Sequence, residues 1–139
     1  MKLVLKDNRT YILRIDKGED VIEEVTKFCN AETIQAGFFR AIGAASEITI
    51  SWYNVHKKEY TDKHIQEDLE IISVTGNVAM LKGKSYVHAH GCLSNEAMEP
   101  VAGHIKQLRV AATCEVVLEA LQGTVEREYS EEIGLNLFS

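Results

Sequence analysis

The sequence has no long hydrophobic run and no cysteine pattern of the kind that staples a secreted domain. No apolar stretch approaches the roughly 20 residues that a membrane-spanning helix needs. Residues 1–7 acquire charge too soon for a secretory signal, so we expect a cytoplasmic protein. Cys29, Cys92 and Cys114 are odd in number and lack paired spacing, which predicts reduced thiols that are buried at Cys29 and Cys114.

A cluster of basic residues is also lacking. The 15 Lys and Arg residues are scattered among 21 Asp and Glu residues, and the formal net charge is −6. No basic patch is longer than the pair Lys57 and Lys58. Affinity for duplex DNA depends on clustered cations that neutralise phosphates, so we expect DNA to be a weak partner that is bound without sequence specificity.

The composition is that of an ordinary soluble globular protein, with 45% hydrophobic and 26% charged residues. A chain of 139 residues fits one domain with a real core, and no linker or repeat divides it. We therefore expect one domain over residues 1–139.

Alternating and helical periodicities predict the elements. One helix has its apolar residues at three- and four-residue spacing, and its first turns are acidic. Residues 36–45 are apolar and contain two glycines, which indicates a buried, bent strand or else a loop that faces a ligand. The polar stretch 61–68 reads as a solvated loop. The predicted helix is 20–30, and the clearest strands are 2–6, 10–16, 47–54, 69–81, 86–93 and 111–121.

Short connections between these strands imply hairpins and an antiparallel sheet. The predicted fold class is α+β, with a mainly antiparallel sheet of about eight strands flanked by one or two helices.

The strand Tyr86–Leu93 contains the most informative pattern. His88 and His90 stand two residues apart, so they share one strand face with Cys92. His104 follows a glycine and would join them if the chain turns back. Three neutral imidazoles suit zinc or another divalent transition metal and leave a coordination position open.

Other interpretations of this strand stay open. The histidines could form a solvated polar face. Cys92 could be a fourth metal ligand, a small core residue, or a nucleophile paired with His90. His56 and His64 lie in polar surroundings and read as surface residues.

Two carboxylates interrupt apolar strands and are further site candidates. Glu70 lies at the start of the strand 69–81, and Glu115 lies within the strand 111–121. A carboxylate in such a position is either exposed or bonded to a specific partner. In a metal-dependent enzyme, Glu70 or Glu115 would be the candidate general base.

Several segments, taken in order, resemble the PPC domain, also called DUF296, which occurs in plants and prokaryotes. The matching pieces are Tyr11–Val21, Ala41–Ala44, Leu69–Asn77, Val87–His90, Ala102–His104 and Ala112–Val117. The resemblance implies an antiparallel sheet flanked by helices, assembly as a homotrimer, and the stand-alone prokaryotic type that is often assigned a DNA-binding role. It also implies a metal on the histidines that match His88, His90 and His104. The plant proteins hold DNA through an AT-hook, and this chain has no Arg-Gly-Arg-Pro hook.

Two functions from different classes follow. The first is a trimeric, DNA-associated or regulatory module with a three-histidine metal site, which leaves room for a small-molecule ligand. The second is a zinc-dependent lyase or hydrolase that acts on a small carbonyl or carboxylate compound. The fold is also similar to that of acetolactate decarboxylase, a likeness that transfers no activity.

An apolar second sheet face, including Phe38, Phe39 and residues 111–118, is the expected subunit interface.

Overall fold

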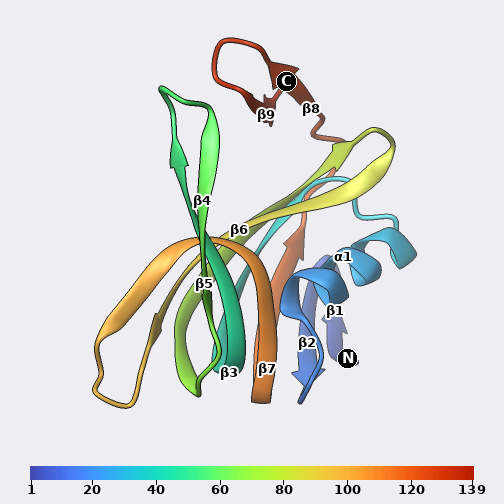
Figure 1. The fold of residues 1–139 in the computed structure, drawn as a ribbon. Coiled ribbons are helices and arrows are strands. Elements are labelled where there is room, and N and C mark those ends of the chain that lie inside the picture. Colours follow the sequence, from blue (N-terminus) through green and yellow to red (C-terminus); the bar gives the residue numbers. More distant parts are fainter.

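The computed structural model describes residues 1–139 as nine β-strands and one α-helix (Figure 1). The helix is α1 (Val21–Ala31). The strands are β1 (Lys2–Asp7), β2 (Thr10–Asp16), β3 (Gly37–Asn54), β4 (Glu59–Ile65), β5 (Leu69–Leu81), β6 (Lys84–Ser94), β7 (Pro100–Ala120), β8 (Arg127–Ser130) and β9 (Leu135–Phe138). The α+β class is confirmed.

Seven strands form one antiparallel sheet in the order β1-β2-β7-β6-β5-β3-β4. Because β7 also pairs with β3, the strands β3, β5, β6 and β7 close into a ring. Strands β8 and β9 form a separate C-terminal hairpin, which lies near the tip of the β3–β4 hairpin (Figure 1). The long strand β3 therefore runs from the core to the β3–β4 hairpin, which contacts the C-terminal hairpin.

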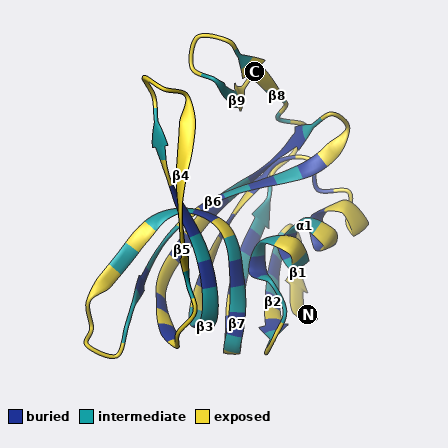
Figure 2. Cartoon of the chain, viewed as in Figure 1, coloured by how far each residue is buried: buried dark blue, intermediate teal, exposed yellow.

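The helix α1 closes one side of the core. Its N-terminal cap is Asp20, whose carboxylate accepts hydrogen bonds from the backbone N–H of Glu23 (2.9 Å) and from that of Leu108 on β7 (2.8 Å). One side chain thus satisfies a free helix N–H and ties the helix to the sheet. Figure 2 shows the buried side of the helix turned toward the strands. Its buried residues are Val21, Val25, Phe28 and Cys29.

The prediction of a loop over residues 61–68 is wrong for residues 61–65, because β4 pairs with β3 from Glu59 to Ile65. Every residue of β4 before Ile65 is exposed. A strand with water on both faces needs no apolar alternation, so its sequence has no period that marks it as a strand.

Three predicted segments are parts of longer strands. The segments 36–45, from residue 37 on, and 47–54 belong to β3, and 111–121, up to residue 120, is the second half of β7. The bent-strand interpretation of 36–45 is confirmed. At Gly43, which has a φ of +153°, a Cβ atom would lie 2.2 Å from the carbonyl oxygen of Thr113, so only glycine lets β3 and β7 approach there.

The two adjacent phenylalanines point to opposite sides of β3. Phe39 is fully buried in the core, so its assignment to an exposed interface face was wrong, whereas Phe38 is 38% exposed. Alternation along a strand separates neighbours in this way, and the sequence alone did not show which of the two faces inward.

The helix α1 is not long and apolar enough to cross a membrane.

Candidate metal centre

Strand alternation and register bring three histidines together. His88 and His90 lie on β6 on the face opposite buried Val87 and Ala89, as predicted. His104 lies on β7 directly across from His90 in the antiparallel ladder. Directly opposite residues project to the same face, so His104 joins the pair from β6.

Two glycines allow this close approach. Gly91 and Gly103 form the next cross-strand pair, beside His90 and His104. A Cβ atom on Gly91 would lie 2.6 Å from Cδ1 of Ile105, and one on Gly103 would lie 3.0 Å from the Ser51 carbonyl oxygen. A side chain at Gly91 would clash with the Ile105 side chain, and one at Gly103 would press against the β3 backbone, so close packing beside the histidines depends on both glycines.

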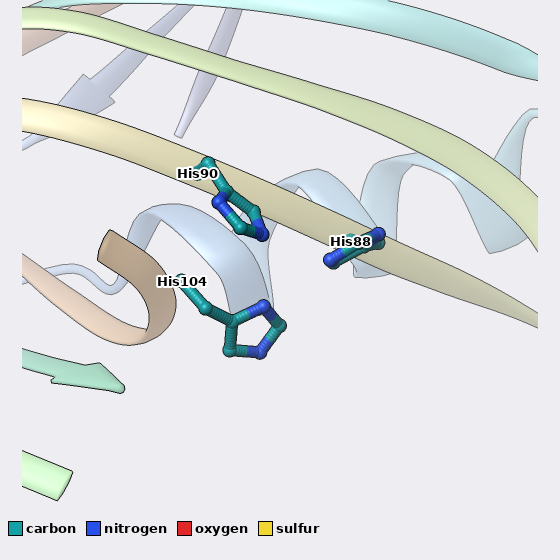
Figure 3. Close-up of side chains that lie close together, drawn as sticks. All are labelled: His88, His90 and His104. Atoms are coloured by element: carbon teal, nitrogen blue, oxygen red, sulfur yellow. The ribbon is translucent and has the colours of Figure 1, made fainter. Parts of the chain in front are cut away.

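The three rings face one another (Figure 3). Their centroids are 5.1 Å apart for His88 and His90, 5.0 Å for His88 and His104, and 5.3 Å for His90 and His104. One ring nitrogen from each histidine lies within 4.8 Å of the other two. Zinc binds imidazole nitrogens at about 2.0–2.1 Å, so the three side chains would move inward from this spacing to hold one ion together.

The protonation states also suit a metal. Burial, followed by the charges of His104, Arg127 and His90, lowers the pKa of His88 to about 4. Burial likewise lowers the pKa of His104. Both rings are therefore neutral at pH 7, as coordination requires. The Nδ1 atom of His104 is buried without a hydrogen-bond partner, an orphaned polar atom that a metal would satisfy.

Strand β4 lines the site beside His104. The Tyr60 ring lies 5.3 Å from the His104 ring, and Lys106 Nζ lies 4.8 Å above the Tyr60 ring. The Asp62 carboxylate accepts hydrogen bonds from Ser51 Oγ (2.7 Å) and from Lys106 Nζ (2.7 and 2.8 Å). These bonds lower the pKa of Asp62, with Lys106 the larger cause. The Lys106 charge is therefore matched by a carboxylate.

Strand β8 supplies an arginine on the His88 side. The Nη1 atom of Arg127 donates to the Asn136 carbonyl oxygen (2.7 Å), and its Nη2 donates to Asn77 Oδ1 (2.8 Å). The same Nη2 lies 3.4 Å from His88 Nδ1. The guanidinium lies 4.4 Å from the ring centroid of Phe138 and 5.4 Å from that of Tyr86.

The other candidates from the sequence lie outside the histidine group. Cys92 is half-buried with a free thiol, opposite Ala102 in the ladder. Glu70 and Glu115 are exposed and together line a different pocket, whose remaining residues are Ile42, Gly43, Ala44, Ile71, Ile72 and Thr113. His56 and His64 are exposed, as predicted.

Sequence reasoning missed Tyr60, Asp62 and Arg127. Tyr60 and Asp62 would have been placed beside the site only if residues 59–65 had been recognised as a strand paired with β3. Nothing in the sequence near Arg127 indicates where the C-terminal hairpin docks, because that contact joins residues 39 positions apart.

The chain matches the family model described as the Plants and Prokaryotes Conserved (PCC) domain over residues 4–122. It is similar to the crystal structure of a candidate DNA-binding protein from Bacteroides thetaiotaomicron, with 28% identity, 97% of this chain and 94% of that chain covered, and a TM-score of 0.94. A metal-containing protein from Archaeoglobus fulgidus is 34% identical, with 100% and 99% covered and a TM-score of 0.88.

Two further similarities extend over only part of the matched protein. The chain is 28% identical over 112 residues to the bifunctional protein GlmU of a Synechococcus strain, and it spans 17% of that protein's length. α-Acetolactate decarboxylase from Bacillus subtilis is 12% identical, with 91% of this chain and 58% of that chain covered and a TM-score of 0.58, which shows a similar fold alone.

We predict that the metal-free protein loses stability in acid through His88. Its pKa is about 4 in the folded state against an ordinary value of 6.5, so the unfolded chain takes up this proton first. The contribution of neutral His88 is complete above pH 6.5 and is lost as the pH falls to about 4. Because the ring is partly solvated, we expect a loss of about 1–2 kcal/mol in the free energy of unfolding.

Urea unfolding of chelator-treated protein at several pH values between 7 and 4 measures this loss. The His88→Gln variant should show a shallower pH dependence than the parent. His56→Gln, at an exposed turn position, is the control and should follow the parent. Parallel curves for His88→Gln and the parent would contradict the prediction.

Proposed function

The chain belongs to the Plants and Prokaryotes Conserved (PCC) domain family, and from that premise we propose that it is a small trimeric module that binds a divalent transition metal. The proposed ligands are His88, His90 and His104. The observation that carries the proposal is the convergence of three ring nitrogens within 4.8 Å of one another. The resemblance to a metal-containing archaeal protein supports it.

The ligand chemistry favours zinc or another late transition ion. Neutral imidazoles suit such ions, whereas magnesium and calcium prefer oxygen ligands. Three nitrogens leave a coordination position for water or an exogenous ligand. A metal bound there would supply Lewis acidity. The protein's part is to hold the three rings facing one another and, through burial, to keep His88 and His104 neutral.

We propose that DNA is at most a weak partner of the isolated chain. Proteins with similar structures from Bacteroides thetaiotaomicron and Ralstonia eutropha are described as candidate DNA-binding proteins, which supports a DNA-associated or regulatory role. Against tight binding stand the net charge of −6 and the scattered cations. Several of those cations are engaged by carboxylates, as Lys106 is by Asp62 and Arg109 by Glu47.

A zinc-dependent lyase or hydrolase acting on a small carbonyl or carboxylate compound is the second candidate. The observation that favours it is a three-nitrogen ligand set without a fourth protein ligand. Glu70 and Glu115 line another pocket, so Asp62 is the carboxylate on the histidine side. Its pairing with Lys106 makes it a weaker base than a free carboxylate would be.

We propose that residues 1–139 act as one domain, with the C-terminal hairpin as part of it. The hairpin is tied to the β3–β4 hairpin by the Tyr53 hydroxyl, which donates to the Ile133 carbonyl oxygen (2.7 Å).

Three free cysteines suit the reducing cytoplasm, our proposed compartment.

We predict that single substitutions will separate metal ligands from surface histidines. His88→Ala, His90→Ala and His104→Ala should each remove most of the bound zinc, since each deletes one of three ligands. His56→Ala and His64→Ala should retain zinc at the parent level. Zinc per folded chain, measured by mass spectrometry after metal-replete purification, decides the matter. Equal zinc in all five variants, or none in the parent, would refute the metal site.

We predict that the protein binds AT-rich duplex DNA only in the non-specific range, with a dissociation constant of about 10⁻⁶ M or weaker at physiological salt. Fluorescence anisotropy with AT-rich and GC-rich duplexes of equal length, at about 150 mM salt, measures both affinity and selectivity. A nanomolar, AT-selective dissociation constant would overturn this expectation.

We predict a homotrimer whose interface includes the exposed apolar side chains of Ile42 on β3 and Ile72 on β5. Ile42 and Ile72 are 57% and 56% exposed and line the same pocket, so they form an apolar patch of the kind that marks an interface. Ile42→Glu should shift the assembly toward monomer in sedimentation velocity at micromolar concentration. Leu5→Glu, on the edge strand β1, is the control for an added charge at an exposed apolar position. A monomeric parent protein would contradict the proposed assembly.

A further inference from the structure

Arg127 is a partly buried cation without a carboxylate partner. Its neighbours are the Asn136 carbonyl oxygen, the Asn77 amide oxygen, His88 and two aromatic rings. None of the protein's ion pairs includes it. Its Nε atom is buried and has no hydrogen-bond partner. Removing a charge from water without a counter-charge is unfavourable, so this arrangement lacks an anion.

Metal binding at His88 would remove one of the hydrogen-bond acceptors of Arg127. A guanidinium only donates, so Arg127 Nη2 can interact with His88 Nδ1 only while that nitrogen keeps a free lone pair. A neutral imidazole has one such lone pair. If the metal takes Nδ1, the lone pair is used; if it takes Nε2, the proton moves to Nδ1. In either case Arg127 loses this acceptor.

The charges at the site then call for an anionic ligand. Three neutral imidazoles leave the full double charge of a divalent ion, and Arg127 adds another positive charge beside His88. Lys106 and Asp62 neutralise each other through two short contacts, so neither changes this balance. Neither a neutral nor a cationic ligand would offset the remaining charge.

We propose that the open coordination position takes a small oxyanion that bridges the metal and Arg127. The inference rests on the proposed metal site and adds the class of ligand. One oxygen of a carboxylate or phosphate would bind the metal, and a second would accept from the guanidinium. Arg127 lies on β8, in the C-terminal hairpin, and this hairpin therefore completes the proposed site. The hairpin lies outside residues 4–122, the part that matches the family model.

The test uses cobalt-loaded full-length protein, because the visible spectrum of cobalt(II) reports its coordination. Acetate and inorganic phosphate are titrated separately at constant ionic strength, which also distinguishes a carboxylate site from a phosphate site. The parent should show a saturable spectral change with at least one of them. Arg127→Met should retain one cobalt per chain and bind that anion about tenfold more weakly or worse.

Two further variants separate anion binding from loss of structure. Arg127→Lys keeps the positive charge but lacks the paired donors of the planar guanidinium, so it should bind the anion with intermediate affinity. Arg14→Met removes an exposed arginine of β2 and should match the parent. Equal anion affinity in the parent, Arg127→Lys and Arg127→Met, or a parent that loads cobalt but responds to neither anion, would overturn the inference. A parent that binds no cobalt would refute the metal site itself, and this inference with it.

Discussion

The antiparallel register between β6 and β7 is the constraint on which the site depends. It places His104 opposite His90, and a slip of one residue would turn His104 toward the core and break the group of three. The register is held from both sides, because β7 pairs with β3 as well as with β6. The glycine pair Gly91 and Gly103 then allows the strands and their neighbours to pack closely beside the histidines.

Local charge at the site differs from the charge of the whole chain. The protein is acidic overall, at −6, but the histidine group is bordered by Arg127 and Lys106. Only Lys106 has a carboxylate partner, which is Asp62. A small, partly buried positive site suits a small anion, whereas an extended polyanion such as DNA needs many cations spread along its backbone.

Most of the fold was predictable, and the exceptions have physical causes. Strands with one buried face, such as β2 and β6, show alternation and were found from the sequence. Strand β4 was missed because both of its faces contact water. Phe39 was placed on the wrong face because two adjacent phenylalanines satisfy either orientation of a strand equally well.

The sequence by itself determined that His88 and His90 share a face, because the side-chain period of a strand is a local property of the backbone. It also determined that the cysteines are unpaired and that the chain is acidic. Only the tertiary structure decided that His104 completes the group and that Asp62 and Arg127 border it. Those placements depend on strand register and on the docking of a hairpin, which arise from contacts between residues far apart in the chain.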